Sequence, residues 1–140
     1  MLNNELLRLV YFSTVKSTMT NDDLDKILTQ SRINNSAMGI TGILFYGGTD
    51  FIQVLEGEQT HIINLYAKII NDTRHWNCRI LDIHFDKARI FRDWSMGYVN
   101  SSKADFERLS SLLEHRYKQH HMATKEITDI LRSYLGKVAP

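Results

Sequence analysis

The chain of 140 residues contains only one cysteine, Cys78. A single cysteine excludes an internal disulfide and any metal site built from several cysteines, and it suits the reducing cytosol. We therefore expect a cytoplasmic protein in which Cys78 is a small buried hydrophobic residue.

Long hydrophobic runs are also missing. No segment approaches the roughly 18 consecutive apolar residues that a membrane-spanning helix needs. The N-terminus, MLNNELLRLVYFS, has no basic region followed by a long apolar stretch. The sequence therefore predicts neither secretion nor membrane association.

An excess of one charge is absent as well. The 17 Lys and Arg residues nearly balance the 16 Asp and Glu residues, which leaves a formal net charge of +1. This balance provides no long-range attraction for nucleic acid or for an anionic membrane. The first apolar run is not followed by GxGxxG, and no P-loop motif occurs, so a Rossmann or NTPase fold has no support. Any binding must depend on a local site.

The hydrophobic pattern predicts alternating strands and helices within one domain. Strands are expected at residues 6–13, 39–46, 51–56, 78–85 and 90–99, with a hairpin at 47–50. One helix should begin after Thr20 and run to about Asn34, and a second should cover 62–70 and end near Asn71. In a strand over 78–85, Leu81, Ile83 and Phe85 share a face, and in a strand over 90–99, Trp94 and Met96 do.

This order of elements is that of an α+β, ferredoxin-like fold, in which a mixed five-stranded sheet carries two helices on one face. Residues 101–140 differ, because their pattern predicts two amphipathic helices, one after Ser102 and one between Thr124 and Gly136. We expect these helices to cover the other face of the sheet. The expected organisation is one domain over 1–100 and a helical extension over 101–140.

Gln53 lies in the middle of an apolar strand and should point the same way as Phe51 and Leu55. An unpaired buried amide costs about 1–3 kcal/mol, so Gln53 needs a polar partner inside the protein. Tyr11, in the first strand, needs one for the same reason. A backbone group or a water molecule could satisfy either residue, and that alternative remains open.

Other polar residues also fall on apolar faces. Helical spacing puts Ser31 and Asn35 beside the apolar stripe of the first helix, although Asn34 or Asn35 could instead cap that helix. Tyr11, Asn35 and Gln53 would then converge on one groove between the helices. Three hydrogen-bonding groups in an apolar cleft indicate a pocket for a flat ligand with a polar edge.

Charged residues cluster at the end of the second helix. Lys68 and Asp72 are four residues apart, and Arg74 and His75 follow. They form either a solvated salt-bridged surface or a cationic mouth for phosphate at the same groove.

Five segments, in order, resemble the BLUF family of blue-light sensors that use flavin. The similarity extends over about residues 6–100, and the segments are RLVY at 8–11, NNSAMGITGIL at 34–44, FIQVLEG at 51–57, DTRH at 72–75 and WSM at 94–96.

The resemblance implies a non-covalently bound flavin, FAD or alternatively FMN, with its isoalloxazine ring between the first two helices. It implies that Tyr11 gives an electron and a proton to the flavin in light, that Gln53 then changes its hydrogen bonds, and that Asn35 anchors the ring. The remaining residues of the implied groove are Ser31, Asn34, Lys68, Asp72, Arg74 and His75. Trp94 and Met96 are implied to pass the signal on, since this pair can exchange places beside the glutamine in BLUF proteins.

We therefore expect a photoreceptor without a catalytic domain, one that forms a homo-oligomer and signals to a separate protein partner through the C-terminal helices. One alternative is a small acylphosphatase-type enzyme that uses Arg8 or Arg32 with Asn34. The other is an RNA-recognition module, which the near-neutral charge disfavours. His115, His120 and His121 lack an acidic or cysteine partner at suitable spacing, so no metal site is expected.

Overall fold

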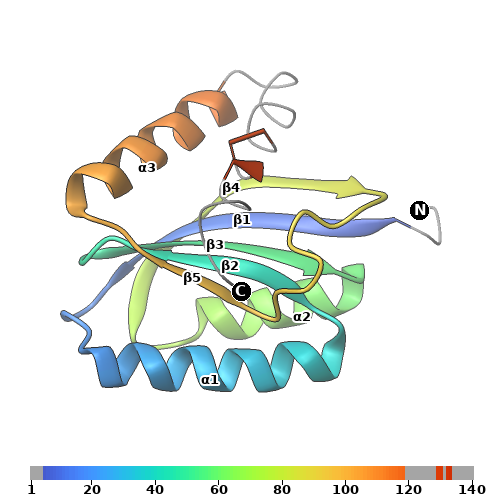
Figure 1. Ribbon diagram of the computed structural model, residues 1–140, viewed down its shortest axis with the longest axis horizontal. Helices are drawn as coiled ribbons and strands as arrows, with labels where there is room; N and C mark the ends of the chain where they lie inside the picture. Colours follow the sequence, from blue (N-terminus) through green and yellow to red (C-terminus); the bar gives the residue numbers. More distant parts are fainter. Residues whose placement is uncertain (1–4, 119–128, 131, 134–140) are drawn as a thin grey trace.

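Five strands form one mixed sheet in the computed structural model, in the order β4-β1-β3-β2-β5 (Figure 1). The strands are β1 (Leu6–Val15), β2 (Thr41–Tyr46), β3 (Asp50–Gly57), β4 (His75–Asp86) and β5 (Gly97–Asn100). Neighbours among the first four pair antiparallel, whereas β5 runs parallel to β2. This sheet confirms the predicted α+β class. The structure describes residues 5–118, 129–130 and 132–133.

Helices cover both faces of the sheet. The helices α1 (Asn21–Met38) and α2 (Gln59–Ile70) lie against one face, and α3 (Lys103–Lys118) lies against the other (Figure 1). In the part of the chain that is described, no helix is long and apolar enough to cross a bilayer. Of the second predicted C-terminal helix, only Ile130 is seen to pack against the core, and most of its residues lie outside the described part.

The core consists of two apolar clusters separated by the sheet. Val10, Phe12, Phe45 and Ile52 pack with α3 on one face. On the other face, Leu9, Leu44 and Leu55 pack with α1 and α2. Because β1, β2 and β3 are buried on both faces, their sequences are nearly continuous in apolar residues.

The ends of α1 depend on particular residues. Thr20 caps the start of α1 as expected, and together with Asp23 it forms a capping box. The predicted end near Asn34 was wrong, because the helix continues to Met38 and closes at Gly39, whose φ of 66° is left-handed. Glycine adopts that conformation without a steric cost. The extra turn keeps Asn34 and Asn35 inside the helix, so neither residue caps it.

An irregularity in β4 overturns the expected common face of Leu81, Ile83 and Phe85. The pairing of β4 with β1 shifts register between Val10 and Tyr11, and Leu81 packs into the cluster under α3. Ile83 and Phe85 instead remain 45% and 42% exposed. A bulge inserts one residue and so interrupts the alternation of faces.

The predicted strand over 90–99 was also wrong. Regular pairing begins only at Gly97, and residues 87–96 form an irregular segment, which we call the crossing segment. Trp94 joins the cluster under α3, whereas Met96 joins the cluster under α1 and α2. The two side chains therefore lie on opposite faces of the sheet, because the alternation rule applies only to an extended strand.

Candidate functional site

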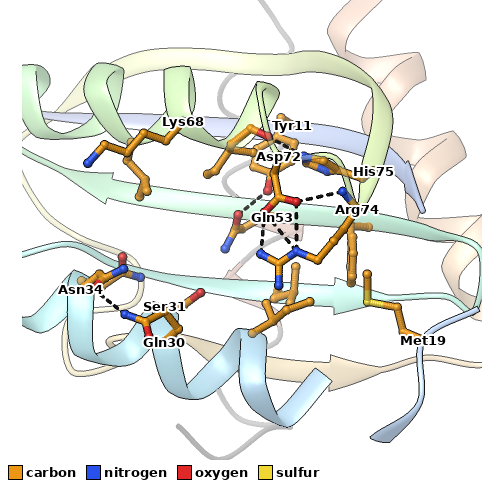
Figure 2. Close-up of a pocket in the computed structure, with 16 residues that line it drawn as sticks. Tyr11, Met19, Gln30, Ser31, Asn34, Gln53, Lys68, Asp72, Arg74 and His75 are labelled. Atoms are coloured by element: carbon orange, nitrogen blue, oxygen red, sulfur yellow. Dashed lines mark hydrogen bonds and ion pairs between the residues drawn. The ribbon is translucent and has the colours of Figure 1, made fainter. Parts of the chain in front are cut away.

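A pocket of about 260 Å³ lies between α1, α2 and the sheet. All nine residues predicted for the groove line it, and the residues labelled in Figure 2 include all of them except Asn35. These nine are Tyr11, Ser31, Asn34, Asn35, Gln53, Lys68, Asp72, Arg74 and His75. Trp94 and Met96 are not among its lining residues.

Strand register brings Tyr11 and Gln53 together. The two residues are direct partners across β1 and β3, and both side chains point to the face that carries α1 and α2. The Tyr11 hydroxyl donates to Gln53 Oε1 over 2.5 Å, and Gln53 Nε2 lies 3.4 Å from Met96 Sδ. The phenol and the amide, only 4% and 7% exposed, therefore satisfy each other.

The surroundings of Tyr11 keep its phenol neutral. Burial raises the pKa of Tyr11 well above its ordinary value, and the nearby Cys78, Tyr66 and Asp72 raise it further. The Tyr66 ring lies 5.3 Å away between centroids. Because the phenol is neutral, its O–H group can donate the hydrogen bond to Gln53.

Asn35 connects the pocket to the crossing segment. It lies in the last turn of α1, is 3% exposed, and donates through Nδ2 to the Ser95 carbonyl over 2.7 Å. Ser31 precedes it by one turn and also lines the pocket. Asn34 is exposed and accepts a hydrogen bond from Gln30 Nε2 over 2.9 Å.

The predicted charged residues do not form one cluster. Lys68 lies toward one end of the pocket, whereas Arg74 and His75 lie toward the other (Figure 2). Asp72 pairs with Arg74, and this hydrogen-bonded ion pair lowers the pKa of Asp72 to about 2. Of the salt-bridged alternative, the structure shows a pair within the loop after α2, between Asp72 and Arg74, rather than one between Asp72 and Lys68.

His75 fastens the start of β4 to the end of α2. Its Nε2 lies 2.6 Å from the Ile69 carbonyl oxygen and its Nδ1 lies 2.8 Å from the Ser13 hydroxyl. Because a carbonyl only accepts, Nε2 carries the proton, and in a neutral ring Nδ1 accepts from Ser13. These two bonds hold the imidazole ring of His75 at the wall of the pocket.

The sequence analysis did not identify the apolar wall of the pocket, and it did not predict the contact of Arg32 with the crossing segment. The missed wall residues are Met19, Ile27, Leu44, Phe51, Leu65 and Ile69. Helical spacing could have identified two of them, because Ile27 lies one turn before Ser31 and Leu65 one turn before Lys68 or Ile69. Arg32 does not line the pocket, but its Nε donates to the Met96 carbonyl over 3.0 Å, a contact that the sequence analysis also did not predict.

Metal ligands do not assemble in the part of the chain that is described, where no group of three or more His, Cys, Asp or Glu residues could hold an ion. The side chain of His115 and both His120 and His121 lie outside the described residues.

The family model for BLUF, sensors of blue-light using FAD, matches residues 6–97. The chain belongs to the BLUF family. Its curated relatives include the photoactivated adenylate cyclase subunit beta of Euglena gracilis, 35% identical over 95 residues, which are 65% of this chain and 11% of that protein. Another is the blue light- and temperature-regulated antirepressor BluF of Escherichia coli strain K12, 29% identical over 86 residues, which are 61% of this chain and 21% of that protein. The chain thus spans only a small part of these relatives.

Solved BLUF structures share the whole architecture. BlrB in its dark state is 32% identical with a TM-score of 0.74, and the match covers 94% of this chain and 98% of BlrB. BlsA in its photo-activated state is 29% identical with a TM-score of 0.75, and the match covers 96% of this chain and 99% of BlsA. The similarity to BlrB and BlsA therefore confirms the fold of this BLUF protein.

The alternative functions find no support in this BLUF structure. Arg8 is 1% exposed and ion-paired with Glu56, so it cannot hold a phosphate substrate as an acylphosphatase requires. Phe12 and Phe45 on the sheet are buried under α3 and cannot stack on RNA bases.

A pH dependence follows from the Asp72–Arg74 pair. The folded-state pKa of Asp72 is lowered from 3.8 to about 2, so the stability from this pair is present above pH 4 and is lost as the pH falls toward 2. The side chains are 30% and 57% exposed, which limits the effect to about 1 kcal/mol. Urea unfolding should show wild type more stable than Asp72→Asn at pH 6, and this difference should be clearly smaller at pH 2. A difference of the same size at both pH values would contradict this assignment.

Proposed function

We propose that this protein is a blue-light photoreceptor that binds a flavin non-covalently in the pocket between α1 and α2. The observation that carries the proposal is the hydrogen bond from Tyr11 to Gln53 in that pocket, with Met96 on the other side of the same amide. The membership in the BLUF family supports it.

The pocket fits the ring system of a flavin. A volume of about 260 Å³ lies just below the roughly 300–1,000 Å³ of small-molecule pockets, so it suits the ring rather than a whole dinucleotide. Apolar walls from Ile27 and Leu65 suit the ring faces, and the amides of Asn35 and Gln53 suit its carbonyl and imide edge. Ser31, Asn34 and His75 would complete the binding set.

The phosphate group of FAD or FMN needs a positively charged side chain as its partner. Lys68 at one end of the pocket and Arg74 at the other are the candidates. We propose FAD as the cofactor and FMN as a substitute, since a structure of the related BlrP1 of Klebsiella pneumoniae contains FMN.

A bound flavin supplies blue-light absorption and, when excited, strong oxidising power. Tyr11 is the phenol placed to give up an electron, and its proton already points at Gln53 Oε1. Gln53 has both an acceptor and a donor, so rotation or tautomerisation of its amide changes its partners while β3 stays in place. Met96, with its soft thioether, can adapt to that change.

The output would pass through Met96 into β5. Arg32 and Asn35 hold the carbonyl groups of Met96 and Ser95, and β5 leads directly into α3. We propose that Met96 and Trp94 transmit the change to residues 101–140, which then alter their contacts with a separate protein partner or within a homo-oligomer. In this proposal the protein is a cytoplasmic sensor with no catalytic activity of its own.

Flavin binding can be tested by fluorescence titration with FAD, FMN and riboflavin. We expect Asn35→Ala to weaken flavin binding about 10- to 100-fold, because it removes a buried amide from the pocket. Asn64→Ala, on the exposed surface of α2, is the matched control and should bind like wild type. Failure of the wild-type protein to take up any flavin would contradict the proposal. Identical size-exclusion profiles in dark and light, with and without candidate partners, would count against signalling by altered contacts.

A further inference from the structure

The crossing segment, residues 87–96, spans the sheet from the end of β4 to the start of β5 at the opposite edge (Figure 1). It contains no helix or strand, yet it places Trp94 and Met96 on opposite faces of the sheet. Something other than regular pairing must hold it in place, because buried backbone N–H groups require acceptors.

The carboxylate of Glu56 supplies those acceptors. Its Oε2 accepts from the Ile90 amide and its Oε1 from the Phe91 amide, each over 2.8 Å. Glu56 is 1% exposed, as is Arg8, whose Nε donates to the same carboxylate over 2.9 Å. Three donors on one carboxylate fix its orientation, and both backbone bonds are charge-assisted.

Further bonds tie the start of the crossing segment to the same place. Arg8 also donates to the Ala88 carbonyl, and Arg89 donates to the backbone of Glu56 and to the Thr41 hydroxyl. Residues 88–91 are therefore held on β1, β2 and β3. Arg92 and Asp93, which follow, are exposed.

The strand β3 contacts the crossing segment on both faces. Gln53 touches Met96 on the pocket face, and Glu56, three residues later, binds Ile90 and Phe91 on the face under α3. An odd spacing in a strand sends side chains to opposite faces. The switching amide and the carboxylate thus act on the two ends of one segment from one strand.

We propose that Glu56 is a positioning residue that anchors residues 90–91 and so sets Met96 against Gln53. The anchor confines any rearrangement to residues 92–96, between Glu56 at one end and Arg32 and Asn35 at the other. The anchoring itself is independent of flavin, whereas its part in the light response rests on the proposed function.

Hydrogen exchange of the flavin-free protein, measured by NMR, tests the anchor without any mutation. We expect the amides of Ile90 and Phe91 to exchange at least about 100-fold more slowly than those of Arg92 and Asp93. Equal rates in the two pairs would overturn the proposal.

The variant Glu56→Gln tests the positioning of Met96. It should speed exchange at Ile90 and Phe91 by at least about 10-fold and shift the methyl resonance of Met96, while the methyl resonance of Met19, which lines the pocket, stays in place. Glu107→Gln, on the exposed surface of α3, should change neither. An unchanged Met96 resonance in folded Glu56→Gln would overturn the positioning role. If this variant does not fold, the wild-type exchange pattern still decides the anchor.

The light response is tested separately in the flavin-loaded protein. Illumination should alter exchange at residues 94–96 and leave Ile90 and Phe91 protected, and a light-induced loss of their protection would overturn the anchor. A protein with no light response would contradict the proposed function, and the exchange pattern in the dark would still decide the role of Glu56.

Discussion

Blue light should shift the absorption spectrum of the bound flavin slightly to the red, and replacing Tyr11 with Phe, or Gln53 with Ala, should abolish that shift while leaving the flavin in the pocket. Tyr11→Phe removes the only hydroxyl that donates to Gln53 Oε1 within the described part of the chain, and Gln53→Ala removes the amide itself. Each change leaves the apolar wall and Asn35 intact. The measurement is a visible absorption spectrum of each loaded variant before and after blue light.

Tyr66→Phe is the matched control for the tyrosine. Its ring lies 5.3 Å from that of Tyr11, so the substitution perturbs the same environment without touching the hydrogen bond to Gln53. We expect this variant to keep the red shift. A full red shift in Tyr11→Phe would mean that a group other than Tyr11 donates the electron and the proton.

Arg8→Ala should lower the free energy of unfolding by about 3–5 kcal/mol, because it leaves the Glu56 carboxylate buried without its charge partner. Arg8 also contacts His84 Nε2 and Asp86 Oδ2, so its removal takes one polar contact from each of these residues as well. Urea unfolding of the flavin-free protein measures this change.

The matched control is Arg108→Ala. Arg108 pairs with Asp105, but the two side chains are 73% and 64% exposed, and such pairs contribute at most about 1 kcal/mol. Similar losses in the two arginine variants would contradict the view that Arg8 belongs to a buried, stabilising network.

Much of the fold was predictable because its signals are local. Strand alternation placed Gln53 on the inner face, and helical spacing placed Asn35 beside the apolar stripe. The order of the elements was then enough to predict that Gln53, Asn35 and Tyr11 lie in one groove. The direct pairing of Tyr11 with Gln53 was not predictable, because strand register depends on the whole sheet.

The prediction errors arose where contacts between residues distant in sequence determine the structure rather than the local hydrophobic pattern. Residues 90–96 alternate like a strand, but the Glu56 carboxylate accepts from the amides of Ile90 and Phe91, and regular strand pairing starts only at Gly97. The buried ion pair of Arg8 was not predictable, because its partners Glu56 and His84 lie 48 and 76 residues away in the sequence. Neither contact has a local sequence signal.

The most direct test of the photoreceptor proposal is the light-minus-dark absorption spectrum of the purified protein after loading with FAD. We expect a flavin spectrum in the dark and a small red shift after blue light that reverses in darkness. A colourless protein that takes up no flavin, or a flavin spectrum that blue light leaves unchanged, would contradict the proposal.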